Sequence, residues 1–184
     1  MDTGLFKTVR QSQTTITELM IPSYANFGGK IHGGTLLSLM DKVAYVCASK
    51  HAGTYCVTAS IDTVDFLHPI EVGELVSLTA SINYVGNSSM IVGIKVISEN
   101  VKTQKFVHTN TSYFTMVAKD DNNNLVKVPA LILESTDDIR RFIEAMMRRK
   151  LKHTYKQEIQ KVKGDIDIER ALKVLENERC RVAV

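Results

Sequence analysis

The chain has 184 residues, of which 44% are hydrophobic and 23% charged, a length that suits one domain of ordinary size with a substantial core. Its 23 Lys and Arg residues against 20 Asp and Glu give a net charge of +3, which argues against a dedicated nucleic-acid-binding protein or a polybasic membrane protein. The charges are unevenly placed, because residues 140–163 hold nine basic side chains against two acidic ones.

The three cysteines, Cys47, Cys56 and Cys180, contain no CxxC spacing. Neither a disulfide framework nor a zinc site is therefore expected, and a reducing compartment is the simpler environment. No segment reaches the roughly 20 apolar residues of a membrane-spanning helix, and the start of the chain lacks the pattern of a signal peptide. We expect a cytoplasmic protein with no metal and with neither nucleic acid nor membrane among its partners.

The first part of the chain predicts a strand, a glycine loop and one helix. Residues 1–15 are polar and unpatterned and are interpreted as a mobile leader, and residues 16–21 as a short strand. A loop over residues 26–34 holds four of the ten glycines. Helical periodicity then runs over about residues 35–50, and Gly53 ends the helix. The helix is apolar on several faces, so we expect protein to surround it.

After the helix the apolar residues alternate with a period of two, which is typical of β-strands. Four strands are expected, at about residues 55–62, 76–84, 90–98 and 105–117. The short polar segments between them, including residues 71–74, suit antiparallel neighbours.

The end of the chain is helical again. Ser135 or Thr136 can cap a helix, and Gly164 is expected to break it before a last amphipathic helix over about residues 165–178. The predicted organisation is a mobile leader (1–15), a central domain (16–133) and a helical C-terminal extension (134–184).

One apolar helix with a long antiparallel sheet predicts an α+β fold in which the sheet wraps around a central helix. The strands are rich in apolar side chains, and we expect that Cys56, Met90, Val92 and Ile94 cannot all lie on the sheet face that packs against the helix. The second sheet face is therefore expected to be partly apolar and to be covered in an oligomer.

The glycine loop follows neither the G-x-x-x-x-G-K-[ST] nor the G-x-G-x-x-G order, so a nucleotide site is not expected. What remains is His32-Gly33-Gly34 at the start of a helix. Free backbone N–H groups there can hold a polarised carbonyl oxygen, and glycine permits its close approach. The alternative is an ordinary loop-to-helix turn.

Asp41 lies in the middle of the otherwise apolar helix, where a carboxylate is costly to bury without a partner. Desolvation would suit it to act as a general base; alternatively it pairs with Lys42 or another cation, or faces solvent. Gly34 and Asp41 share nearly the same helix face but lie about 10 Å apart along the axis. If both act on one carbon, a site shared between two subunits is the simplest arrangement.

The stretch from Asn26 to Asp41, read as Asn-x-x-Gly-x-x-His-Gly-Gly-x-Leu-Leu-x-x-Met-Asp, resembles the helix signature of the hotdog-fold acyl-CoA thioesterases. Further segments similar to this family follow in order, at residues 50–53, 56–60, 65–66, 72–74, 85–90 and 148–150. The resemblance is greatest to the cytosolic long-chain acyl-CoA hydrolases and their single-domain bacterial relatives.

The resemblance implies a hotdog fold and hydrolysis of a fatty acyl-CoA to a free fatty acid and CoA. No metal or organic cofactor is implied, since CoA is part of the substrate and product. It also implies a homodimer as the catalytic unit, and often a homohexamer built as a trimer of dimers. Eukaryotic relatives fuse two hotdog domains, whereas this chain has one, so it must self-associate.

In the family, the residue matching Asp41 acts as general base or nucleophile, and the one matching Asn26 completes the site from the opposite subunit. We hypothesise that the Gly33 and Gly34 amides, with Asn26, polarise the thioester carbonyl, while Asp41 of the partner chain activates water or attacks directly. The residues similar to the family's CoA contacts are Ala59, Ser60, Ile61, Ser88, Ser89, Met90, Arg149 and Lys150.

Three alternatives stay open at this point. A hotdog dehydratase or hydratase would use a catalytic histidine, and His32 lies in the loop. A non-enzymatic acyl-CoA sensor would bind the same ligand without turnover, although no DNA-binding helix pair is recognisable. The basic residues around Lys150 either face CoA phosphates or form a solvated helix face.

Overall fold

The structure of the chain is a computed structural model that describes residues 5–164 and 167–183. Its elements in chain order are β1 (Phe6–Thr8), α1 (Val9–Ser12), β2 (Thr14–Leu19), the 3-10 turn η1 (Pro22–Tyr24), α2 (Gly33–Ala52), β3 (Tyr55–Ile61), β4 (Leu75–Val85), β5 (Ser89–Asn100), β6 (Lys105–Lys119), β7 (Ala130–Ile132), α3 (Thr136–Gly164) and α4 (Ile168–Leu175). The chain divides into two compact units, with the boundary in the sequence between Ala145 and Met146, and each unit is described by itself.

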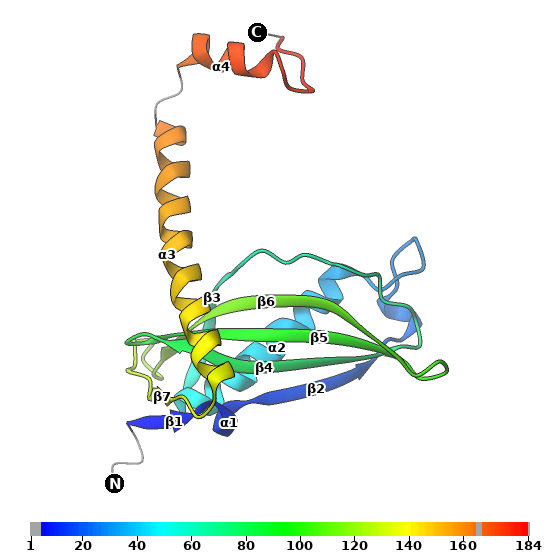
Figure 1. Ribbon diagram of the computed structural model, residues 1–184, viewed down its shortest axis with the longest axis vertical. Helices are drawn as coiled ribbons and strands as arrows, with labels where there is room; N and C mark the ends of the chain where they lie inside the picture. Colours follow the sequence, from blue (N-terminus) through cyan, green and yellow to red (C-terminus); the bar gives the residue numbers. More distant parts are fainter. Residues whose placement is uncertain (1–4, 165–166, 184) are drawn as a thin grey trace. The chain divides into compact units, whose positions relative to one another are not determined.

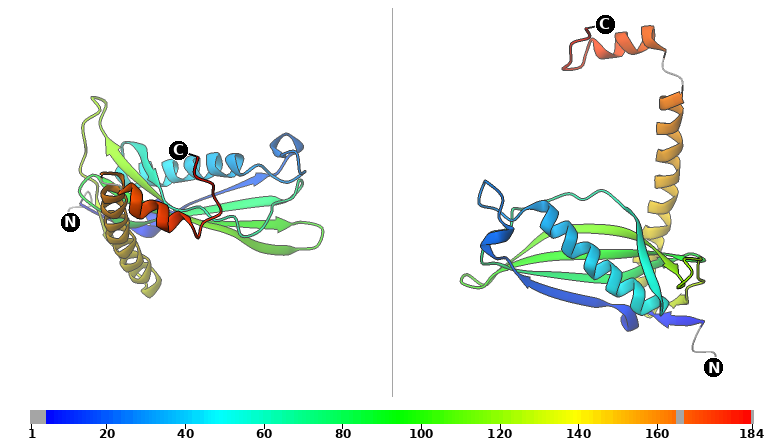
Figure 2. Two further views of the ribbon diagram at one scale, coloured as in Figure 1. Left: turned by 90° about the horizontal axis from the view of Figure 1, so that it is seen from above. Right: turned by 180° about the vertical axis from the view of Figure 1, so that it is seen from behind.

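Five strands form an antiparallel sheet with the spatial order β2-β4-β5-β6-β3. The sheet curls around α2, which lies along its concave side (Figures 1 and 2). This confirms the α+β fold with a wrapped central helix. β3 and β4 follow one another in the chain but are not the neighbours in the sheet that the short segment at residues 71–74 predicted. Residues 62–74 connect β3, at one edge of the sheet, to β4, which lies beside the opposite edge strand β2. Among the described strands, β3 is paired on one side only, with β6.

The central helix α2 is two residues longer at each end than its periodicity predicted. His32 caps its start, and Gly53 ends it with a φ of 72°, a left-handed conformation that glycine adopts without strain. Its buried residues form one stripe: Leu36, Leu39, Met40, Val43, Ala44, Cys47, Ala48 and His51. The expectation that protein surrounds the whole helix is wrong within one chain, because Asp41, Lys42 and Tyr45 lie on an exposed face.

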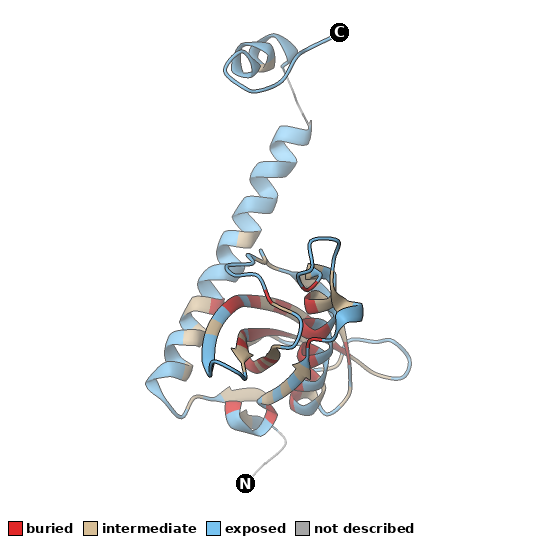
Figure 3. Ribbon diagram, turned by 90° about the vertical axis from the view of Figure 1, so that its right-hand side faces the viewer, coloured by how far each residue is buried: buried red, intermediate tan, exposed pale blue. Residues whose placement is uncertain are grey.

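The inner face of the sheet supplies the rest of the core, where burial is concentrated (Figure 3). Met90, Val92 and Ile94 occupy alternate positions of β5, and Cys56 joins them from the edge strand β3; all four are at most 1% exposed. The expectation that they could not share one face is wrong. A curled sheet turns even its edge strand toward the helix it encloses.

On the part of the outer sheet face formed by β2 and β4, hydroxyl side chains replace the expected apolar ones. The hydroxyls of Thr15 and Thr79 are 3.0 Å apart, and those of Thr17 and Ser77 are 2.9 Å apart, across the pair of β2 and β4. An oligomer is therefore not needed to cover this part of the sheet.

The N-terminal segment, interpreted above as a mobile leader, forms β1, α1 and the start of β2 from Phe6 onward; residues 1–4 lie outside the described residues. β1 pairs in parallel with β7. The Lys7 ammonium donates to the carbonyl oxygens of Lys50 (3.1 Å) and His51 (2.8 Å). These carbonyls lie in the last turn of α2, where backbone acceptors lack helical partners and a cation is favourable.

His51 connects three segments from inside the protein. Its side chain is fully buried, Nε2 donates to the Pro129 carbonyl at 2.9 Å, and Nδ1 lies 3.4 Å from the Ser12 hydroxyl. Burial lowers the pKa of His51, so the ring is neutral. The end of α2, the segment before β2 and the segment before β7 thus meet at one neutral imidazole.

The first turns of α3 belong to the same compact unit as the sheet. Ser135 caps the helix, since its hydroxyl accepts from the Asp138 N–H at 3.1 Å, as its sequence position predicted. Phe142 packs on Tyr84 with ring centroids 5.1 Å apart, and Ala145 is fully buried. This packing extends the unit past the predicted boundary at residue 133, to Ala145. No helix in the described ranges is long and apolar enough to cross a membrane.

Candidate active site

Asn26 is held by its own loop in a way that leaves its amide nitrogen as a donor. Its Oδ1 accepts from the N–H groups of Gly28 (2.8 Å) and Lys30 (3.2 Å). The loop is closed by the Asn26 N–H, which donates to the Lys30 carbonyl at 2.7 Å. Because two backbone donors occupy the oxygen, the Nδ2 hydrogens are left for another acceptor, such as a carbonyl oxygen.

The start of α2 offers one amide to a ligand, where the sequence predicted two. The Gly34 N–H donates to Nδ1 of His32 at 2.9 Å, so the histidine acts as the helix cap. The cap therefore engages the Gly34 amide in this structure, and its contact with a thioester carbonyl stays a prediction. The Gly33 N–H has no hydrogen-bond partner among the described residues. A β-carbon at Gly33 would lie 3.1 Å from the Phe66 ring, so a larger residue here would require that ring to shift by a few tenths of an ångström.

Asp41 accepts a hydrogen bond from a threonine that the sequence did not single out. Thr58, in β3, donates its hydroxyl to Oδ1 of Asp41 at 2.5 Å. The same hydroxyl is 3.4 Å from the sulfur of Met116, a much weaker acceptor than a carboxylate. Asp41 is exposed in the single chain and pairs with this hydroxyl, not with Lys42. The bond fixes the carboxylate on the open face of α2.

The candidate residues line two separate cavities of one chain. A cavity of about 370 Å³ at the start of α2 is lined by Asn26, Lys30, Ile31, Gly33, Leu36, Phe66, His68, Pro69 and Ile70. A second, of about 440 Å³ between α2 and β3, is lined by Asp41, Lys42, Tyr45, Val46, Tyr55, Cys56, Val57 and Thr58. The first holds carbonyl-binding donors and the second holds the carboxylate, so one chain does not bring the two together.

The residues predicted to contact CoA fall in three places. Ala59 is the extra residue of a β-bulge, since Thr58 pairs with Met116 and Ser60 with Thr115. This bulge turns the end of β3, where Ile61 is exposed. The Ser88 and Ser89 side chains lie half-buried at the β4–β5 turn.

The remaining predicted CoA contacts, Met90, Arg149 and Lys150, lie in different environments. The Met90 side chain is fully buried in the core, so only its backbone could contact CoA, and that contact stays a prediction. Arg149 and Lys150 are exposed residues of α3 in the second compact unit. Their contact with CoA phosphates stays a prediction.

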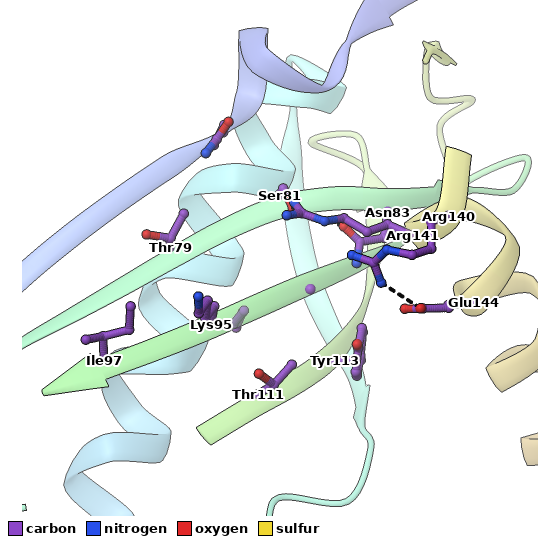
Figure 4. A pocket seen from close by; sticks show the side chains of 13 residues that line it. Thr79, Ser81, Asn83, Lys95, Ile97, Thr111, Tyr113, Arg140, Arg141 and Glu144 are labelled. Atoms are coloured by element: carbon purple, nitrogen blue, oxygen red, sulfur yellow. Dashed lines mark hydrogen bonds and ion pairs between the residues drawn. The ribbon is translucent and has the colours of Figure 1, made fainter. Parts of the chain in front are cut away.

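A third hollow lies on the outer face of the sheet, beside the first turns of α3, and holds none of the predicted site residues (Figure 4). Its volume is about 490 Å³. Arg141 donates to the Ser81 hydroxyl at 3.4 Å, and that hydroxyl donates to Oδ1 of Asn83 at 3.0 Å. A β-carbon on Gly93 would lie 2.3 Å from Nδ2 of Asn83. The glycine therefore makes room for the Asn83 side chain against the sheet.

Two residues at the cavities, Thr58 and Phe66, were noted from the sequence within segments similar to the family, at residues 56–60 and 65–66, but were not assigned to the site. Thr58 belongs to the polar side of an alternating strand, and nothing in its spacing links it to Asp41, which is on another element. Phe66 follows β3 in an irregular segment and reaches Gly33 only through the fold. In the described ranges, no group of three or more His, Cys, Asp or Glu side chains could hold a metal ion.

An antiparallel sheet curled around one long helix is the arrangement of the hotdog fold (Figure 2). Residues 28–105 match the thioesterase superfamily. The chain is 44% identical over 145 residues to protein VdlD of Helicobacter pylori, covering 79% of this chain and 83% of that protein. It is 35% identical over 148 residues to the uncharacterized acyl-CoA thioester hydrolase YkhA of Bacillus subtilis, covering 80% and 86%. The human cytosolic acyl coenzyme A thioester hydrolase is 32% identical over 143 residues, 77% of this chain and 38% of that one.

Solved structures agree with the sequence relatives. An apo-hexameric acyl-CoA thioesterase superposes with a TM-score of 0.79 at 33% identity, covering 82% of this chain and 96% of that one. An acyl-CoA hydrolase of Staphylococcus aureus, solved with butyryl coenzyme A and coenzyme A, gives a TM-score of 0.76 at 31% identity, covering 87% and 99%. That enzyme was also solved with an asparagine, an aspartate and a threonine each changed to alanine, at the same spacing as Asn26, Asp41 and Thr58.

These relatives extend over most of the chain, and the family match includes the start of α2 and Asp41. The chain belongs to the thioesterase superfamily. Its relatives within that superfamily include acyl-CoA thioester hydrolases.

Proposed function

We propose that this protein hydrolyses fatty acyl-CoA thioesters to a free fatty acid and CoA. The observation that carries the proposal is the Asp41 carboxylate, fixed by the Thr58 hydroxyl on the open face of α2 in a thioesterase fold. The S. aureus hydrolase changed at an aspartate, a threonine and an asparagine of matching spacing supports it further.

The site is shared between two chains. Asn26 and Gly33 line one cavity and Asp41 another, about 10 Å along the same helix. The edge strand β3 has unpaired backbone groups on one side, and such edges are commonly closed by pairing with a second copy. Three exposed apolar side chains line the same cavity as Asp41: Tyr45, Val46 and Tyr55. A symmetric dimer that joins β3 to its copy covers them and places Asp41 of one chain beside Asn26 of the other.

In this dimer the Asn26 Nδ2 and the Gly33 N–H donate to the thioester carbonyl oxygen and stabilise the negative charge that develops on it. Asp41 of the partner chain takes a proton from a water molecule whose oxygen attacks the carbonyl carbon. The carbon–sulfur bond then breaks, CoA leaves as the thiol, and the acid retains the water oxygen. In the alternative route, the Asp41 carboxylate itself attacks the carbonyl carbon and the carbon–sulfur bond breaks, so that CoA leaves as the thiol. Water then cleaves the resulting anhydride at the Asp41 carbonyl carbon, which frees the fatty acid and restores the carboxylate. Turnover in ¹⁸O-labelled water distinguishes the two, because only direct attack leaves label in the Asp41 side chain.

The rest of the proposed description follows from the site. The thioester needs no metal or organic cofactor, because an amide pair and a carboxylate supply the required donors and base. The residues near the end of β3 and in the β4–β5 turn, Ser60 and Ser89 among them, face the CoA portion of the substrate. The hexameric relative supports a trimer of such dimers, and the cytosolic human relative supports a cytoplasmic location.

The first experiment measures thiol release from acyl-CoAs of increasing chain length. We expect Asp41→Asn and Asn26→Ala each to lower kcat by about 10²- to 10⁴-fold, the usual contribution of a positioned base or oxyanion donor. Asp121→Asn, in an exposed turn, is the matched control and should keep full activity. Tight CoA binding without thiol release would favour an acyl-CoA sensor instead. A hydratase is disfavoured because Nδ1 of His32 already caps the helix.

A mixing experiment tests whether the site is shared. A mixed dimer of the Asp41→Asn chain and the Asn26→Ala chain contains one intact site and one doubly altered site. After the two inactive variants are unfolded together and refolded, random pairing should restore about a quarter of the native activity. A site within one chain predicts no restoration, since every chain then carries a lesion.

A further inference from the structure

The part of α3 from Leu151 to Lys163, called here the tail helix, is almost entirely exposed (Figure 3). It carries a stripe of exposed apolar side chains. Leu151, Tyr155, Ile159 and Val162 are 61%, 66%, 38% and 61% exposed. At about 100° per residue these four side chains fall within about 80° of the helix circumference. Exposed apolar side chains gathered on one helix face mark an interaction surface, whereas scattered ones do not.

Basic side chains flank this stripe. By the same helical geometry Lys152, Lys156 and Lys163 lie within about 60° of one margin, and Lys161 lies within about 80° of the other. Residues 148–163 hold seven Lys and Arg against one acidic residue, Glu158, which pairs with Lys161 at 2.7 Å. The proposed hydrolysis leaves this cluster unexplained beyond Lys150.

The last helix repeats the amphipathic pattern. In α4, Ile168, Ala171, Leu172 and Leu175 fall on one face at helical spacing, and Asp167 caps its start by accepting from the Arg170 N–H at 3.2 Å. Ile168 is 63% exposed and Leu172 40%. The second compact unit therefore presents two helices with apolar faces open to solvent.

We propose that the tail helix binds the surface of an anionic lipid bilayer. Charge complementarity selects this occupant: lysine stems on both margins of an apolar stripe allow the stripe to enter the headgroup region while the ammonium groups reach lipid phosphates. A second copy of the same helix would bring two strongly basic segments together, and like charges repel. A nucleic acid would use the charges and leave the apolar stripe in water.

Surface binding needs no spanning helix, so it agrees with the finding that no described helix is long and apolar enough to cross a membrane. It revises the expectation that no membrane is among the partners, which rested on net charge and on the lack of a spanning segment. A net charge of +3 for the chain conceals the local excess in the tail helix. The proposal stands independently of acyl-CoA hydrolysis.

The test uses the full chain and vesicle flotation. The protein should float with vesicles of equal phosphatidylcholine and phosphatidylglycerol, and should remain behind with phosphatidylcholine alone or at about 1 M salt, where the Debye length falls to about 3 Å. Neutralising Lys156 and Lys163 together should lower binding about 25-fold, at roughly fivefold per charge. The matched control neutralises Lys102 and Lys127, exposed residues of the other compact unit.

A spectroscopic readout follows the stripe itself. The chain contains no tryptophan, so Tyr155→Trp creates a single reporter in the stripe and Gln160→Trp a control on the opposite face. Anionic vesicles should shift the emission of the first to the blue and leave the second unchanged. Hydrolysis of a short-chain acyl-CoA in solution should be the same in the lysine variants and the native chain.

Three results would overturn the proposal. The first is no flotation of the native chain, and the second is equal loss in the tail variant and the Lys102 and Lys127 control. The third concerns a protein partner: if Leu151→Gln with Ile159→Gln changes the molar mass in light scattering, the stripe lies in an interface between chains. Circular dichroism of each variant checks that the helix persists.

Discussion

Removal of the Thr58 hydroxyl should slow the chemical step while leaving the fold intact. Thr58→Val keeps the β-branched shape preferred in a strand and deletes only the group that donates to Asp41 at 2.5 Å. A hydrogen bond to a charged group contributes about 1.5–3 kcal/mol. If all of it serves to orient the carboxylate, kcat should fall about 10- to 150-fold. Thr58→Ser, which keeps the hydroxyl, should stay within a few-fold of the native value.

The assay is thiol release at saturating acyl-CoA, with KM measured on the same preparations. KM should change little, because Thr58 acts through Asp41 and does not hold the substrate. Thr79→Val is the matched control: it also loses a threonine hydrogen bond, the one to Thr15, but on the outer sheet face. A Thr58→Val protein with native kcat, or a Thr79→Val protein equally impaired, would refute the assigned role of the hydroxyl.

Three further predictions concern groups outside the cavities. Burial lowers the pKa of His51 below its ordinary 6.5, so the unfolded chain takes up a proton before the folded chain does. The contribution of His51 to stability is therefore complete above pH 6.5 and falls as the pH drops below it. In His51→Gln, the urea midpoint should fall less over the same pH range. Burial raises the pKa of Cys47 to about 12 and also that of Cys56, so Ellman's reagent should label only the exposed Cys180 in the native protein, and two fast thiols would contradict this. Gly93→Ala places a β-carbon against the Asn83 side chain and should lower the free energy of unfolding by about 1–3 kcal/mol in chemical denaturation. The double variant with Asn83→Ala should recover part of this loss. If the two losses are additive, the clash is not the cause.

Local signals in the sequence were sufficient for α2, α3, α4 and the strands of the five-stranded sheet, because caps and periodicity depend on neighbouring residues. They did not predict β1, α1 or β7, which are short. Gly53 ends α2 in the left-handed conformation that its position implied, and Ser135 caps α3. The strands of the sheet have nearly the predicted limits. The order of the strands was beyond such signals, since the pairing of β3 with β6 depends on a long crossing segment.

The candidate site divides in the same way. Asn26, Gly33 and Asp41 were identified from the glycine loop, the isolated carboxylate and the family resemblance. The competition for the Gly34 amide was not, because a histidine at the cap position is an uncommon acceptor. Thr58 and Phe66 reach the cavities from another strand and a crossing segment, so only the folded chain brings them to α2. The excess of basic residues in residues 140–163 is evident from the sequence. That the lysines flank an apolar stripe follows only from their positions around the helix α3.

The unpaired edge of β3 exposes a newly synthesised chain to aggregation. Its sequence, Tyr-Cys-Val-Thr-Ala-Ser-Ile, contains no charged residue and no proline, the usual means by which an exposed strand avoids pairing with foreign strands. The Ala59 bulge is the only irregularity that interrupts it. In the proposed dimer a second subunit covers this edge, whereas a lone subunit leaves it open to pairing with foreign strands. The thermal stability of the proposed dimer should therefore rise with protein concentration, and dilution that separates the subunits should lower the activity per chain.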